Sequence, residues 1–107
     1  MNRTHWIATA ALAVLAGCAA GSRSLPPAER LVTEEPGRDL ETLARGRALT
    51  VTECSACHRQ YWPSEYTPQQ WAKLARTMGG KADLGRTDRQ ALERYLVAAA
   101  EAQAPER

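Results

Sequence analysis

The sequence contains no phenylalanine, and aromatic residues make up only 6% of its 107 residues. A chain of this length corresponds to one small domain, and without phenylalanine its side chains fill a hydrophobic core poorly. An excess of one charge is also missing, because 14 Lys and Arg face 12 Asp and Glu. This near balance argues against nucleic-acid binding, which requires clustered basic charge. Apolar residues still reach 44%, which argues against a wholly disordered chain.

The sequence also lacks an apolar run long enough to span a membrane. Residues 7–16 form an apolar stretch of ten residues, whereas a spanning helix needs about 20. The stretch follows a polar start that carries Arg3 and precedes small residues, a pattern typical of a secretory signal. We therefore expect residues 1–17 to be a signal peptide. A buried N-terminal helix is the alternative, but the stretch is apolar on every face.

The stretch ends in Leu15-Ala16-Gly17-Cys18, a sequence that resembles the lipobox of bacterial lipoproteins. In that family the cysteine is lipidated and begins the mature chain. The resemblance thus implies a lipid anchor at Cys18 on the periplasmic side of a bacterial membrane. The residue after Cys18 is Ala19 and not Asp. By resemblance to enteric lipoproteins, this favours the outer membrane. The alternative is ordinary cleavage nearby, with Cys18 left free or paired between chains.

The segment at residues 18–38 holds several Gly, Ser and Pro residues with mixed charges and no lasting apolar period. This composition predicts a lipidated N-terminus followed by a flexible tether. We expect the folded domain to cover residues 39–104.

Three main helices are expected in this domain. Asp39 is a candidate N-cap for a helix that runs on to Val51. Gly46 lies in the middle of that helix, where glycine costs about 1 kcal/mol against alanine, so it indicates close approach of another backbone. No stretch alternates as a strand does. The sequence therefore predicts an all-α domain.

The second and third helices have start signals of their own. The sequence Thr67-Pro68-Gln69-Gln70 combines an N-cap, a proline at the first helical position and a capping box. We expect this helix to end at Gly79-Gly80. A second capping box, Thr87-Asp88-Arg89-Gln90, is expected to open the last helix, whose apolar stripe includes Tyr95 and Leu96.

The motif that carries chemistry is Cys54-Ser55-Ala56-Cys57-His58, which fits the attachment pattern of c-type haem. Two cysteines three positions apart can each form a thioether with one vinyl group of the same porphyrin. The histidine after them is then carried under the iron. The motif predicts one covalent haem c, bound through Cys54 and Cys57, with His58 as an axial iron ligand. Export agrees, because bacterial c-type haem is attached outside the cytoplasmic membrane.

Three other interpretations of the motif are weaker. A thiol–disulfide catalyst usually places Cys-x-x-Cys after a strand, and the sequence predicts no strand. A structural zinc ion needs four ligands, and Cys54, Cys57 and His58 supply three. A plain structural disulfide leaves His58 without a role.

With this motif, the chain from about residue 43 to residue 97 resembles a small bacterial monohaem cytochrome c. In that family a helix glycine lies eight positions before the first haem cysteine, as Gly46 lies before Cys54. That glycine lets the first and last helices cross closely against an aromatic and a leucine, for which Tyr95 and Leu96 are suitable. The resemblance implies three main helices wrapped around a covalently bound haem. It departs at Thr50, where the family often has an aromatic residue.

The second axial position on the iron has one conventional candidate. After removal of residues 1–17, Met78 is the only methionine and His58 the only histidine. Met78 is therefore the expected second axial ligand, and a His/Met pair suits electron transfer. Its spacing of twenty residues from His58 is shorter than usual for the family. The alternative is that Met78 is a core residue, seven positions after Trp71 on one helix face.

Several residues near the motif are candidates for supporting roles. We expect the other ring N–H of His58 to meet a carbonyl positioned by Pro63 or Pro68. Other candidates share aromatic or basic side chains that could border the haem, bind its propionates or form a docking rim: Arg59, Tyr61, Trp62, Tyr66, Trp71, Arg76, Lys81 and Arg86.

These expectations together indicate an electron carrier, tethered to a membrane and serving periplasmic or membrane-bound redox proteins. The haem would also supply apolar mass that the missing phenylalanine does not. Two alternatives remain, a five-coordinate gas-binding or sensing haem protein and a haem subunit of an oxidoreductase complex. No acid–base pair or nucleophile stands in a recognisable arrangement, so we do not expect an enzyme.

Overall fold

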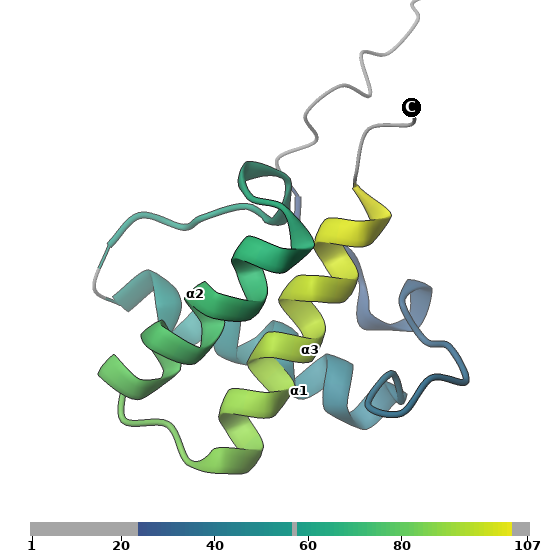
Figure 1. Ribbon diagram of the computed structural model, residues 1–107, viewed down its shortest axis with the longest axis horizontal. Helices are drawn as coiled ribbons and strands as arrows, with labels where there is room; N and C mark the ends of the chain where they lie inside the picture. Colours follow the sequence, from purple (N-terminus) through teal and green to yellow (C-terminus); the bar gives the residue numbers. More distant parts are fainter. Residues whose placement is uncertain (1–23, 57, 104–107) are drawn as a thin grey trace, which may run out of the picture.

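The computed structural model describes residues 24–56 and 58–103, and in this part of the chain every regular element is helical. The three long helices are α1, Leu40–Thr52, α2, Pro68–Lys81, and α3, Arg86–Ala102. Three short 3₁₀ turns accompany them, at Ala28–Arg30, Cys54–Ala56 and Pro63–Glu65. Figure 1 shows α2 and α3 side by side, with α1 crossing behind α3. The expected all-α domain of three main helices is confirmed for the described residues.

Two of the expected helix starts are present as the sequence predicts. The Asp39 side chain accepts a hydrogen bond from the Thr42 backbone N–H at 3.0 Å and caps α1. At the start of α2, the Thr67 hydroxyl accepts from Gln70 N–H at 3.1 Å, and the Gln70 side chain accepts in return from Thr67 N–H at 2.9 Å. Pro68 occupies the first turn. These signals act over three or four residues, which is why the sequence alone reveals them.

The end of α2 differs from the sequence prediction. The helix does not stop at Gly79-Gly80 but runs through both glycines to Lys81. It ends because Asp83 adopts a left-handed conformation, with φ 57°. The N–H groups of Asp83 and Leu84 then return to the carbonyls of Gly80 and Gly79, at 3.1 and 2.9 Å. This pattern is a Schellman ending that uses aspartate where glycine is commoner.

The start of α3 also corrects the sequence prediction. Gly85 is the N-cap, and the helix begins at Arg86, so Thr87 lies inside the first turn. Asp88 therefore belongs to the helix, and its carboxylate pairs with Arg45 of α1 through two hydrogen bonds of 3.0 and 2.9 Å. The expected capping box at residues 87–90 is wrong, because the helix begins one residue before it.

The crossing of α1 over α3 is built on Gly46, as the mid-helix glycine predicts. A Cβ atom at this position would lie 2.1 Å from the Ala91 carbonyl oxygen and 2.6 Å from Tyr95 Cβ. Only glycine permits this separation of the two helices. Thr50, one turn later, is buried, and its hydroxyl donates to the Gly46 carbonyl at 2.9 Å.

The segment at residues 24–38 corrects the expected start of the folded domain at residue 39. Ala28 and Leu31 are buried in the core, and the Tyr95 hydroxyl of α3 donates to the Pro26 carbonyl at 2.8 Å. The Gln103 side chain donates to Ser24 at 3.2 Å. These contacts tie the segment to α3, so this part of the expected tether is packed onto the helices.

The core lies where α3 meets α1 and α2. Its largest wholly buried side chains are Trp71, Tyr95, Leu43, Leu92 and Leu96. Among the described residues, no helix has the length and hydropathy to cross a membrane. The expected signal peptide at residues 1–17 and the expected lipidation site Cys18 lie outside the described residues.

Candidate functional site

A cavity of about 390 Å³ lies between the end of α1, the loop that follows it, and α2. Its wall includes Cys54, His58 and Met78. The cavity thus collects one cysteine and the histidine of the motif together with the methionine that lies twenty positions further on. Cys57 lies outside the described residues. A cavity of this size is within the range of about 300–1,000 Å³ that is usual for cofactor sites.

Aromatic rings form much of the wall. The ring centroids of His58 and Tyr61 are 4.7 Å apart, those of Tyr61 and Tyr66 6.2 Å, and those of Tyr66 and Trp71 5.2 Å. The Tyr66 and Trp71 rings meet edge to face, a favourable geometry for aromatic pairs. Other apolar side chains of the wall are Leu74, Leu84 and Leu92. The cavity is therefore suited to a largely apolar group.

Cys54 lines this cavity from the 3₁₀ turn after α1. Its side chain is half-buried, and burial, with a smaller contribution from the Glu53 carboxylate, raises the pKa of its thiol. Thiol–disulfide catalysts need a lowered thiol pKa. The environment of Cys54 thus does not favour that interpretation, and neither does the absence of strands from the described residues.

The His58 ring is held by a backbone carbonyl, although the side chain is exposed. Its Nδ1 atom lies 2.7 Å from the carbonyl oxygen of Arg59. Because a carbonyl only accepts, this contact requires the proton on Nδ1, and in the neutral imidazole Nε2 then keeps its lone pair. This is the usual state of a metal-binding histidine, whose second nitrogen donates to a neighbouring acceptor.

The acceptor for His58 differs from the one expected. The Pro63 carbonyl accepts a hydrogen bond from the indole N–H of Trp71 at 2.8 Å, and Arg59 supplies the carbonyl that meets His58. Trp71 is only 1% exposed, so its N–H requires a partner inside the protein. Pro63 serves the packing of Trp71, which anchors the loop to α2.

Arg59 has a protein partner that sequence reasoning missed. Its guanidinium makes two hydrogen bonds to the Glu65 carboxylate, at 2.7 and 3.2 Å, and lies 4.3 Å from the centre of the Tyr61 ring. The hydrogen bonds to Glu65 raise the pKa of Arg59. Glu65 also accepts from the Trp62 backbone N–H at 2.6 Å. In sequence only the opposite charges six positions apart hint at this pair.

Met78 lies on α2, half-buried, with its side chain at the cavity wall and against the core. This position is compatible with both roles considered from the sequence.

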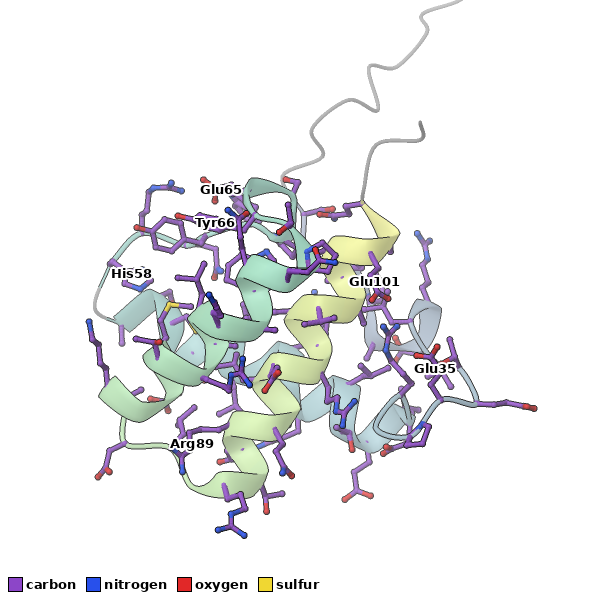
Figure 2. All side chains as sticks on the ribbon, in the orientation of Figure 1. Glu35, His58, Glu65, Tyr66, Arg89 and Glu101 are labelled. Carbon is purple, nitrogen blue, oxygen red and sulfur yellow. The ribbon has the colours of Figure 1, made fainter. Side chains whose placement is uncertain are left out.

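Figure 2 shows His58, Glu65 and Tyr66 on the side of the molecule opposite Glu35 and Glu101. Tyr61, Tyr66, Trp71 and Lys81 border the cavity, whereas Trp62, Arg76 and Arg86 are not among its lining residues.

Comparison with protein-family models, with curated proteins and with solved structures finds no match to this chain. The fit of a c-type haem is therefore judged from the residues themselves. The cavity has the size of a cofactor site, its walls are apolar and aromatic, and Cys54 and His58 share it. The contact of His58 Nδ1 with the Arg59 carbonyl leaves Nε2 available in the neutral imidazole. On these grounds the described residues fit the group.

Proposed function

We propose that this protein carries one covalently attached c-type haem and transfers single electrons. The observation that carries the proposal is that Cys54 and His58 of the motif border one apolar cavity together with Met78 of α2. A chance Cys-x-x-Cys-His sequence would have no reason to lie beside such a cavity. When bound, haem supplies a one-electron Fe(II)/Fe(III) couple, and His/Met ligation favours a relatively high reduction potential.

In this proposal, different residues hold different parts of the haem. Cys54 and Cys57 would hold the haem through thioethers, and His58 would bind its iron through Nε2. Met78 would supply a second iron ligand through its sulfur. The aromatic and leucine side chains of the wall exclude water, which lowers the local dielectric and tunes the potential. In this proposal the chain makes and breaks no substrate bond.

The proposal includes a lipid anchor at Cys18 and a location on the periplasmic side of a bacterial membrane. Residues 24–38 are packed onto the helices, so only residues 19–23 separate Cys18 from the packed segment. A fully extended connection of this length reaches about 20 Å. The domain would thus stay close to the lipid surface, where a short connection raises its effective concentration near membrane-bound redox partners.

Haem attachment is tested on full-length protein produced in a host that matures c-type cytochromes. The wild type should gain the mass of one haem and give a c-type pyridine haemochrome spectrum. The double variant Cys54→Ser/Cys57→Ser should carry no covalent haem. Ser55→Ala is the matched control, because Ser55 lies between the cysteines and its exposed side chain bonds only locally, to the Val51 carbonyl. Wild-type protein without covalent haem would overturn the proposal.

A five-coordinate gas-binding haem protein is the second candidate, and one observation favours it. Met78 packs against the core as well as bordering the cavity, so packing alone can account for its position. Carbon monoxide separates the two functions. An electron carrier with two protein ligands should bind carbon monoxide slowly and weakly in the ferrous state, whereas rapid, tight binding would favour the gas-binding function.

A further inference from the structure

We propose that Glu65 is the positioning residue for the His58 imidazole. In this inference, which rests on the proposed function, Glu65 fixes the loop whose backbone carbonyl holds His58 in its metal-binding tautomer. His58 and Glu65 are not adjacent in the sequence, and Arg59 connects them.

The connection consists of contacts that follow one another. The Glu65 carboxylate receives two hydrogen bonds from the Arg59 guanidinium, at 2.7 and 3.2 Å, and one from the Trp62 backbone N–H at 2.6 Å. The Arg59 carbonyl in turn accepts from His58 Nδ1–H at 2.7 Å. One carboxylate thus closes the loop at residues 59–65 on itself.

This closure matters because the loop is solvent-exposed at the residues concerned. His58, Arg59 and Glu65 are all exposed, so burial does not fix the direction of the Arg59 carbonyl. A two-point contact between guanidinium and carboxylate has a defined geometry. The Arg59 guanidinium also lies 4.3 Å from the Tyr61 ring centre, and that ring borders the cavity. The Arg59–Glu65 contact therefore fixes the loop on the side from which His58 reaches the cavity.

A hydrogen bond from Nδ1–H to a carbonyl makes the imidazole a stronger electron donor to a metal. Donation of this kind stabilises the ferric state more than the ferrous state, which lowers the reduction potential. Removal of the Glu65 carboxylate should therefore free the carbonyl, weaken the hydrogen bond and raise the potential.

The test uses full-length protein from the maturation host, with the variants Glu65→Ala and Glu65→Gln. Glu65→Gln keeps an acceptor for the Trp62 N–H but loses the charged pair with Arg59. It therefore provides a milder change should the alanine variant fail to fold. The matched control is Asp88→Asn, which removes an equally bidentate pair with Arg45, at 3.0 and 2.9 Å. Neither Arg45 nor Asp88 borders the cavity.

The measurements are the reduction potential and the solvent-exchange rate of His58 Nδ1–H, followed by NMR in the reduced protein. We expect both Glu65 variants to show faster exchange and a higher potential, with the larger effect in Glu65→Ala. Asp88→Asn should show wild-type values for both. Wild-type exchange and potential in both Glu65 variants would overturn the inference, and so would equal effects of Asp88→Asn.

Failure of the proposed function remains distinguishable from failure of this inference. If the wild-type protein carries no haem, the proposed function fails, and ¹⁵N NMR of the same sample reports the His58 tautomer directly. Protonation at Nδ1 in the wild type that is lost in both Glu65 variants would still support Glu65 as the positioning residue. A tautomer that does not respond to Glu65 would overturn the inference as well.

Discussion

Gly46 of α1 lies directly against the Ala91 carbonyl of α3, so closely that a Cβ atom on Gly46 would lie 2.1 Å from that oxygen. The backbone of α3 cannot move away without disturbing Tyr95 and Leu96, which are wholly buried. The crossing of the two helices therefore depends on a single hydrogen atom in place of a side chain.

Replacement of this glycine should destabilise the protein strongly. Gly46→Ala forces the helices apart, and overpacking of this kind typically costs about 1–3 kcal/mol. Gly80→Ala is the matched control, because Gly80 also lies in a helix but a Cβ there meets nothing within 4 Å. The control should gain about 0.5–1 kcal/mol from helix propensity. Denaturant unfolding of both variants measures the difference, and equal stabilities would contradict the packing described.

Tyr95 should make stability depend on pH in the alkaline range. Burial raises the pKa of Tyr95 to about 12 from its ordinary value of 10, against an opposing effect of the Arg47 guanidinium. Because the folded state holds the proton more tightly, its contribution is fully present below pH 10 and is lost as pH rises through about 12. The free energy of unfolding should fall over this range.

Tyr95→Phe should remove this part of the alkaline loss. The variant also loses the hydrogen bond to the Pro26 carbonyl, at a cost of about 0.5–1.5 kcal/mol at neutral pH. Tyr66→Phe is the control, because the Tyr66 ring is exposed and Tyr95 remains intact. If the stability of Tyr95→Phe falls with rising pH as steeply as that of the wild type, Tyr95 is not the group responsible.

Met78→Ala tests the second axial ligand. If the Met78 sulfur binds iron, the oxidised wild type has a weak far-red absorption band, and the variant lacks it. The variant should also bind carbon monoxide much faster in the ferrous state. Leu74→Ala is the control, since Leu74 lies one turn earlier on the same helix and borders the same cavity. A wild-type spectrum without the far-red band would exclude Met78 as a ligand.

Trp71→Phe tests how the loop is attached to α2. The indole N–H donates to the Pro63 carbonyl at 2.8 Å, and phenylalanine leaves this carbonyl without that donor. We expect a loss of about 1–3 kcal/mol in the free energy of unfolding, while covalent haem content stays at the wild-type level. Trp62→Phe, a half-buried position outside the cavity wall, should change stability less. A neutral Trp71→Phe variant would argue against this attachment.

The sequence by itself determined the features that depend on near neighbours. The caps at Asp39 and Thr67 are in place because each is made with a residue three positions away. Gly46 predicted the helix crossing, because a glycine inside a helix is costly unless another backbone packs closely against it. The fold class followed from the same local signals, and so did the positions of Cys54, His58 and Met78 as candidates.

Only the tertiary structure decided which of these residues share a cavity, and where the domain begins. Residues 24–38 have no apolar period, yet Ala28 and Leu31 are buried in one apolar cluster with residues of α1 and α3. Helix α2 continues through Gly79, which lies beside the Arg89 side chain of α3, and ends only where Asp83 is left-handed. The His58 contact is different, because its partner is the carbonyl of its sequence neighbour Arg59. The contacts between separate elements are set by the relative placement of helices, which short-range sequence patterns do not encode.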